Sequence, residues 1–395
     1  MRSVYLDNNA TTRVDPQVLD AMLPFLTEQF ANPSSAHAAG EAVAEAVRRA
    51  RRQVRDLLGA VSDQEIVFTS GGTEADNTAI LSALQTQPMR RKVIVSAVEH
   101  PAVLALCDHL RRVHGTIVSR IPVDRLGRLD RAAYRAALGP GTALVSIMWA
   151  NNETGTIFPV EELAEEAHAC GALFHTDTVQ AAGKLPIDLR NSSIDMLSLS
   201  GHKLHAPKGI GALFVRKQVA LAPLLRGGKQ ERGRRAGTEN VPGIVALGEA
   251  AALAAEHLAT ETARVRTLRD VLERGVTQTV PGTLVLGDLA ARLPNTSCIA
   301  FEDVDAEPIL MGLSRAGIAA SSGSACGSGT MEPSHVLRAM AVPYRALHGA
   351  IRFSFSRDNS VEDVAHVLDV LPGTVAQARQ TSPFADIDPM SIAAE

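Results

Sequence analysis

One cysteine of the chain lies in an unusual setting, the stretch SSGSACGSG at residues 321–329, where every other residue is Ser, Gly or Ala. A free cysteine usually behaves as a small buried apolar side chain, whereas a stretch of Ser and Gly is flexible and hydrated. A thiol in such a stretch is either incidental or an accessible nucleophile, because the reactive form of cysteine is the thiolate. From these residues alone, Cys326 stays open between the two interpretations.

A lysine offers a second candidate, in the stretch SGHK at residues 200–203, directly after an apolar run. Lysine usually lies on a solvated face, but at a strand end inside a cleft its amine can form a Schiff base. Pyridoxal phosphate (PLP) is bound in that way, with an Asp beside its pyridine nitrogen. HTDTVQ at 175–180 places Asp177 at the end of another strand-like run. Lys203 and Asp177 together favour a PLP site.

A glycine turn completes this set, in SGGTE at residues 70–74. Between a strand and a helix, such a turn presents backbone N–H groups and a helix N-terminus, which suit an anion. No G-K-[ST] follows, so a Walker loop is excluded. Alone, an ordinary turn is the commoner interpretation, but beside Lys203 and Asp177 the turn is a candidate phosphate site.

The elements that must position these residues alternate between strand-like and helix-like patterns, which predicts an α/β fold with a mostly parallel sheet. In such sheets ligands bind at the carboxyl ends of the strands, where the clusters SGGTE, VEH, NNETG, HTDTVQ and SGHK fall. We therefore expect one cleft. The expected segments are a helix at 40–59, strand–turn–helix at 65–84, strand 92–100, helix 101–115, strand and loop 142–155, helix 159–171, and strands at 172–180, 195–203 and 209–215.

The pattern changes after GTENVPG at 237–243, which predicts a second, smaller α+β domain. An Ala-rich helix is expected at about 243–275, followed by a strand at 296–301, a helix at 306–317 and a strand at 350–356. We predict a large domain at 15–260 and a small domain formed by 1–14 and 261–395, which carries the Cys326 loop.

Composition sets limits on the partners. The 395 residues are 46% hydrophobic with a net charge of −4, which gives no electrostatic reason to expect nucleic acid or a membrane. No run approaches the ~18 uninterrupted apolar residues of a membrane helix, and the N-terminus does not resemble a signal peptide. We expect a cytoplasmic protein. The other cysteines, Cys107, Cys170 and Cys298, form no C-x-x-C pair and are expected to be structural or incidental.

With these residues in view, the sequence resembles the cysteine desulfurases, PLP enzymes of the class V aminotransferase group, over essentially its whole length. Within that family it is most similar to the NifS branch, which serves nitrogenase cluster assembly. The motifs that carry the resemblance are YLDNNATT (5–12), NPSSAH (32–37), FTSGGTE, EHPAV, ANNETG, HTDTVQA, SGHKLHAPKG, RRAGTEN, SSGSAC and IRFS (351–354). The resemblance implies a PLP-dependent transferase fold of type I.

The resemblance also implies roles for the residues that match the family's motifs. Lys203 should hold PLP as a Schiff base and move the substrate α-proton, Asp177 should keep the pyridine nitrogen protonated, and His100 should stack on the ring. Gln180 should bond the phenolic oxygen of PLP. The implied phosphate ligands are Gly72, Thr73, Ser200 and His202.

Two further residues should bind the carboxylate of the substrate L-cysteine: Asn152, which also borders the cofactor, and Arg352, whose fork suits a carboxylate. Thr238 should reach the phosphate of a neighbouring subunit, which implies a homodimer. Cys326 should take the sulfur as a persulfide, on a swinging tether, and pass it to a NifU- or IscU-like iron–sulfur scaffold. Its only expected metal contact is an iron–sulfur cluster held transiently with that scaffold.

Several alternatives share these motifs. A housekeeping IscS-type desulfurase and a selenocysteine lyase use the same cofactor, and an aminotransferase needs no loop cysteine. A non-catalytic sulfur carrier on a degenerate PLP fold is disfavoured, because degeneration should delete Lys203 or Asp177. The basic stretch at 226–239 has no aromatic residue for base stacking, so we expect an ordered loop beside the cofactor rather than a nucleic-acid surface.

Overall fold

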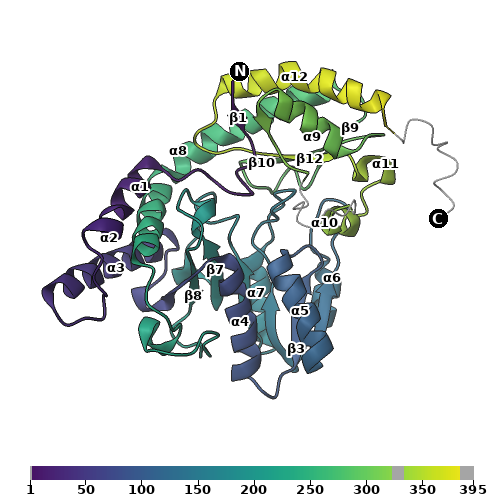
Figure 1. Cartoon of the computed structure of the whole chain (residues 1–395). Helices are drawn as coiled ribbons and strands as arrows, with labels where there is room; N and C mark the ends of the chain where they lie inside the picture. Colours follow the sequence, from purple (N-terminus) through teal and green to yellow (C-terminus); the bar gives the residue numbers. More distant parts are fainter. Residues whose placement is uncertain (1, 323–332, 383–395) are drawn as a thin grey trace.

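The computed structural model of the chain describes residues 2–322 and 333–382 (Figure 1). Cys326 and the tether predicted around it lie outside the described residues.

A seven-stranded sheet forms the centre of the large part of the molecule, with strand order β2-β8-β7-β6-β5-β3-β4. Every neighbouring pair is parallel except those made by β8, which runs antiparallel to β2 and β7. The predicted α/β class with a mostly parallel sheet is confirmed. The strands are β2 (Ile66–Thr69), β3 (Lys92–Ser96), β4 (Ile117–Ile121), β5 (Thr142–Ser146), β6 (Leu173–Asp177), β7 (Met196–Ser200) and β8 (Gly211–Val215).

Helices cover both faces of this sheet, and the apolar residues of each strand divide between them. On β2, Val67 packs with the buried residues of α4 (Gly72–Thr86) and α5 (Pro101–His114). Its neighbours Ile66 and Phe68 point to the opposite face, because side chains alternate along a strand. That face packs against α3 (Ala38–Leu57), α7 (Val160–Ala169) and part of α8.

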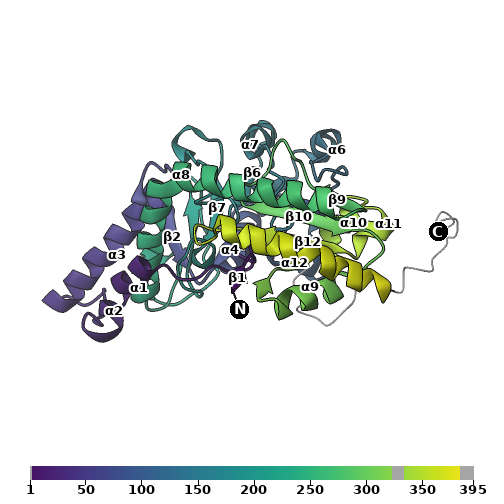
Figure 2. The ribbon, with the colours of Figure 1, turned by 90° about the horizontal axis from the view of Figure 1, so that it is seen from above.

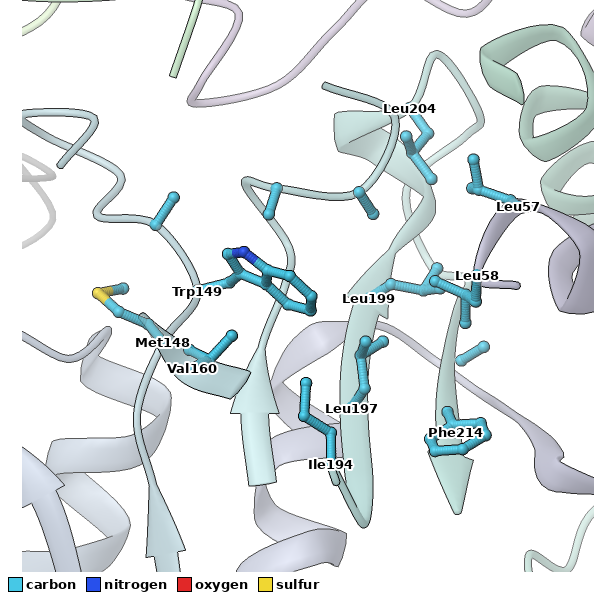
Figure 3. Packing of buried hydrophobic residues seen from close by; sticks show 14 of the residues in the cluster. Leu57, Leu58, Met148, Trp149, Val160, Ile194, Leu197, Leu199, Leu204 and Phe214 are labelled. Carbon is cyan, nitrogen blue, oxygen red and sulfur yellow. The ribbon is translucent and has the colours of Figure 1, made fainter. Parts of the chain in front are cut away.

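Figure 3 shows the packing of this second face at close range. Leu197 and Leu199 project from β7 into the same cluster as Leu57 and Leu58, which lie at the end of α3. Phe214 of β8 belongs to the cluster as well. The apolar alternation on β7 thus fixes the register of the strand that ends at Ser200, directly before the candidate lysine.

The longest helix, α8 (Val241–Thr279), joins the two parts of the molecule (Figure 1). By length and composition alone it is apolar enough to cross a membrane, yet 61% of its most apolar window is buried inside the protein. It packs against α1 (Pro16–Met22), α3 and α12 (Val361–Gln380), and Figure 2 shows it running beside α12. These contacts identify α8 as a core helix.

The smaller part lies above the large sheet in Figure 1 and has its own apolar cluster, formed by Val4, Leu6 and residues from Val265 onward. Its elements are the pair β1 (Val4–Tyr5) and β11 (Ile318–Ala319), the sheet β12-β10-β9 (Ala350–Ser354, Thr296–Phe301 and Thr283–Leu286), and the helices α9 (Ala306–Arg315) and α12. The predicted domain boundaries at 14 and 261 stay a prediction, which this separate cluster supports.

The remaining helices are short: α2 (Pro24–Thr27), α6 (Arg131–Ala137), α10 (His335–Ala339) and α11 (Tyr344–Leu347). Several predicted bounds shift by a few residues. The strand expected at 92–100 ends at Ser96, and residues 97–100 turn into α5, whose first turn is capped by His100. That turn places His100 at the carboxyl edge of the sheet.

Candidate active site

A cleft of about 670 Å³ opens at the carboxyl ends of the strands. It is walled by residues that directly follow β2, β3, β6 and β7, together with residues of the smaller part. Ten residues predicted from the sequence line it, which brings the strand-end clusters together: Gly72, Thr73, His100, Asn152, Asp177, Gln180, Ser200, His202, Lys203 and Arg352.

Lys203 ends a short 3-10 turn (Gly201–Lys203) that follows β7. Its Nζ donates hydrogen bonds to the backbone carbonyls of Asn9 and Ala10, so the N-terminal segment holds the amine in the cleft. Burial, assisted by the positive charge of Arg352, lowers the pKa of Lys203 to about 8. The amine is therefore far closer to its neutral, nucleophilic form than a solvated lysine.

Asp177 is the last residue of β6 and is only 6% exposed. Its Oδ1 accepts a hydrogen bond from the backbone N–H of Val179 at 2.8 Å. Burial raises the pKa of Asp177, while the positive charges of His100 and Lys203 act in the opposite direction. The carboxylate is held in the cleft with no cation hydrogen-bonded to it among the described residues.

The glycine turn at 70–73 has the features of a phosphate cradle. Gly71, at the N-terminus of the 15-residue helix α4, supplies no side-chain cap to the free N–H groups of the first turn. A Cβ on Gly72 would lie 2.8 Å from Val179 Cγ2, so a larger residue would distort the turn. Ser200 and His202 line the cleft nearby, and burial lowers the pKa of His202 to about 4. A neutral imidazole can donate one N–H to an anion.

Arg352 and Asn152, which are predicted to bind a carboxylate, both line the cleft. Arg352 of β12 is buried, and it donates to the Asn152 carbonyl at 3.0 Å and to Asp7 Oδ1 at 2.8 Å. Its Nε has no hydrogen-bond partner among the described residues. A buried guanidinium with a donor to spare is suited to a bound carboxylate.

Among the predicted site residues that the structure describes, Thr238 is the one that does not line the cleft. Thr238 is exposed, in the loop before α8, where Gly237 and Glu239 line a separate small pocket. Cys326 lies outside the described residues. The basic stretch around Thr238 is ordered by ion pairs: Arg235 contacts Glu74 on the first turn of α4, at 2.9 Å. The loop therefore lies against the helix of the phosphate cradle.

Sequence reasoning assigned no role to several residues that build the cleft. The N-terminal residues Asp7 and Asn9 contact Arg352 and Lys203, although they lie more than 190 residues away in the chain. After the undescribed segment, Ser334 donates to the buried Glu153 at 2.6 Å, and His335 Nε2 contacts the Glu99 carbonyl at 3.0 Å. Four of these residues lie in motifs quoted from the sequence: Asp7 and Asn9 in YLDNNATT, Glu99 in VEH and Glu153 in NNETG. Ser334 and His335 lie in none of those motifs.

The remaining cysteines are placed as expected. Cys107 and Cys298 are buried and Cys170 is partly buried, and all three are free thiols. Burial raises the pKa of Cys107 and of Cys298 to about 12. Neither thiol is ionised near neutral pH, so neither is a nucleophile.

Taken together, the cleft fits a cofactor with a carbonyl carbon, a ring nitrogen and a phosphate. Lys203 can form a Schiff base, Asp177 can hold a proton on a ring nitrogen, and the uncapped turn before α4 can hold a phosphate. PLP carries these three groups.

Comparisons with known proteins bear on this geometry. Residues 4–367 match the aminotransferase class-V family. The cysteine desulfurase of Gluconacetobacter diazotrophicus is 66% identical over 98% of this chain and 96% of that protein. The cysteine desulfurase NifS of Azotobacter vinelandii is 58% identical over 97% of this chain and 95% of its own length. A solved structure named a NifS-like protein superposes with a TM-score of 0.89 at 37% identity, covering 95% of this chain and all of that one.

These matches span nearly the whole chain and agree with the PLP-shaped cleft. The chain belongs to the cysteine desulfurases of the class V aminotransferase family, enzymes that depend on pyridoxal phosphate.

Proposed function

We propose that the chain removes sulfur from L-cysteine, giving L-alanine and a persulfide on Cys326. The observation that carries this proposal is the meeting of Lys203, Asp177 and Arg352 in one cleft. These residues supply an amine, a carboxylate and a carboxylate-binding cation, which together suit an amino-acid substrate of a PLP enzyme.

When bound, PLP withdraws electrons from the substrate α-carbon. Lys203 anchors the cofactor and then moves a proton to and from that carbon, a task for which a pKa of about 8 is suited near neutral pH. Asp177 would hold a proton on the ring nitrogen, and His100, which caps the N-terminus of α5, would border the ring. Gln180 donates to the phenolic oxygen.

The same residues orient the ligands. Gly72, Thr73, Ser200 and His202 hold the phosphate at the start of α4. Arg352 and Asn152 hold the substrate carboxylate, which fixes the amino acid with its side chain free to meet a nucleophile. Because Arg352 is itself fixed by Asp7, its guanidinium is positioned before the substrate arrives.

Cys326 then acts as the nucleophile. Its thiolate forms a bond to the substrate sulfur as the carbon–sulfur bond breaks. The electron pair of the broken bond stays with the carbon, which takes up a proton and becomes the methyl group of alanine. The sulfur remains on Cys326 as a persulfide, so one thiol and one cysteine give one persulfide and one alanine.

The test is the Cys326→Ala variant loaded with PLP. We expect it to keep the yellow absorbance of the bound cofactor and to release no sulfide from cysteine in the presence of dithiothreitol. Substantial sulfide release would contradict the assignment. Retained transamination in this variant would favour an aminotransferase, and turnover of selenocysteine only would favour a selenocysteine lyase. A colourless wild-type protein would indicate a degenerate fold.

We further propose that the persulfide sulfur is delivered for iron–sulfur cluster assembly, with nitrogenase as the destination. The 58% identity to a relative named NifS supports this role. Sulfur transfer from the loaded protein to a NifU-like and to an IscU-like scaffold, measured side by side, separates it from a housekeeping role. Any cluster contact of Cys326 would be transient and shared with the scaffold.

We propose a homodimer as the active form, located in the cytoplasm. Thr238 is exposed beside the phosphate helix, where a second subunit can accept it. Large apolar side chains are also exposed along the N-terminal helices: Leu19, Leu23, Leu26 and Phe30, the last 79% exposed. A row of exposed apolar residues is typical of an interface. Light scattering gives the mass, and Thr238→Ala is expected to weaken PLP binding without dissociating the dimer.

A further inference from the structure

A second lysine lies under the cleft and has no place in the proposed reaction. Lys184, in the turns after β6, is only partly exposed. Its Nζ donates a hydrogen bond to Gln180 Oε1 at 3.0 Å. Burial and the positive charge of Lys203 lower the pKa of Lys184 to about 7. Removing a lysine amine from water lowers the stability of the fold. The cost indicates that Lys184 has a role beside the cleft residue to which it bonds.

Gln180 is the residue through which Lys184 meets the cleft. Its amide is 5% exposed, and its Nε2 donates to the backbone carbonyl of Asn9 at 3.0 Å. Since the amide oxygen is occupied by Lys184 and one N–H by Asn9, the second N–H remains for the cleft that Gln180 lines. The Asn9 carbonyl also accepts from Lys203, so the four residues form one continuous network.

We propose that Lys184 is a positioning residue that acts through Gln180, fixing its amide so that it presents an N–H to the cofactor. This inference rests on the proposed function, because it concerns the oxygen of PLP that Gln180 is expected to meet. Without Lys184, the amide oxygen of Gln180 has lost its donor and the amide can turn. The cleft would then present an acceptor where the cofactor needs a donor.

The charged groups that act on Lys184 come from three other elements: Lys203 on the turn after β7, Glu261 on α8 and Arg352 on β12. Glu261 favours the ammonium form of Lys184, whereas Lys203 and Arg352 oppose it. The Lys184 amine that donates to Gln180 therefore lies among charges of both signs. The test must separate the effect of its hydrogen bond from the effect of its own charge on the cofactor.

A measurable consequence concerns the nitrogen of Lys203 in the PLP-loaded protein. A donor to the phenolic oxygen stabilises that oxygen most when the neighbouring nitrogen has lost its proton. The donor therefore lowers the pH at which the cofactor absorbance changes. Loss of one hydrogen bond should raise this midpoint by about 0.5–1 pH unit.

The experiment is a pH titration of cofactor absorbance in the PLP-loaded wild type and in the variants Lys184→Met, Gln180→Met and the double variant. We expect Lys184→Met and Gln180→Met each to raise the midpoint, and the double variant to match Gln180→Met alone, since the two residues act as one unit. Lys184→Arg should restore most of the wild-type value. Lys217→Met removes an exposed lysine just after β8 and should titrate as wild type.

Two results would overturn the proposal: an unchanged midpoint in Lys184→Met, or an equal shift with and without Gln180, which would indicate a through-space charge. If Lys184→Met does not fold, Lys184→Gln serves in its place, with a shift in the same direction because its side chain is too short to reach. These failures are distinct from failure of the proposed function, in which the wild type would show no PLP absorbance to titrate.

Discussion

Two buried carboxylates near the central sheet differ in how their charges are neutralised. Glu231, in the loop before α8, accepts from both terminal nitrogens of Arg51 at 2.6 and 2.7 Å and from the backbone N–H of Phe68 at 3.1 Å. Asp177, at the end of β6, accepts one backbone hydrogen bond, and no cation bonds to it among the described residues. Both side chains are nearly inaccessible.

The contrast distinguishes a carboxylate that stabilises the fold from one that is kept for a ligand. Glu231 and Arg51 satisfy each other and tie the basic loop to β2, so the pair belongs to the scaffold. Burial of Asp177 carries a desolvation cost that the charges of His100 and Lys203 offset only in part. A bound cation-like group can offset the rest, which is how a site keeps a carboxylate available for a ligand. A buried carboxylate that accepts no hydrogen bond from a cation of the described chain, such as Asp177, is therefore a stronger sign of function here than burial of a carboxylate by itself.

The largest expected effect comes from Asp177→Asn, which tests whether Asp177 is the carboxylate that serves the reaction. We expect sulfide release to fall by about 10²–10⁴-fold, the range for loss of a proton-holding group. The thermal midpoint should stay the same or rise, because an uncompensated buried charge is removed. Asp369→Asn, on the exposed face of α12, is the matched control. A large drop in stability with activity retained would reverse the roles assigned to the two carboxylates.

The next effect tests whether the ion pair of Glu231 with Arg51 stabilises the fold. Glu231→Leu leaves the Arg51 guanidinium buried without its partner, and unfolding free energy should fall by about 3–5 kcal/mol in denaturant titrations. The double variant Arg51→Met with Glu231→Leu should recover much of this loss, because no charge is then stranded. If the single and double variants are equally unstable, the pair is not the reason for the stability of this loop.

The smallest effect, when expressed per pH unit, concerns an intermediate case, Glu99, which is fully buried. It accepts from Ser96 and from the Met148 N–H, and within residues 2–322 and 333–382 it accepts from no cation. Burial raises its pKa from 4.5 to about 8. The folded state then binds more protons than the unfolded state between these values, so stability is greatest below pH 4.5 and falls as pH rises toward 8.

Glu99→Gln should remove this dependence, whose slope is at most about 1.4 kcal/mol per pH unit. Unfolding free energies at pH 5, 6.5 and 8 provide the measurement, with the wild type losing stability relative to the variant at each step. A constant difference across that range would show that Glu99 stays ionised in the folded protein.

The parts of the site that could be predicted are those encoded locally. Apolar runs with polar ends predicted the parallel sheet, and five such ends predicted one cleft, because parallel strands share an edge. Lys203, Asp177 and the turn at Gly72 follow from that rule. Asp7 and Asn9 do not, since they reach the cleft through a two-residue strand, β1, that pairs with β11 across the smaller part.

Lys184 and Glu153 were missed for a different reason. Both are charged side chains in turns, where a solvated side chain is the default. Only the fold shows that Lys184 bonds to Gln180 and that Glu153 bonds to Ser334. Thr238 was singled out only through the resemblance to a family. Its expected contact is with a second chain, and no property of a single chain encodes that geometry.

The pairing of β1 with β11 has a consequence for how the protein is made. Val4 pairs with Ile318, and Asp7 accepts a hydrogen bond from Arg352. The first residues to be synthesised therefore lack these partners until Ile318 and Arg352 have been made. The carbonyls that hold Lys203 belong to that same early segment. The nascent chain therefore cannot close its cleft until nearly all of it has left the ribosome. Capture of the cofactor becomes a late event, available only to chains that have been translated past Arg352.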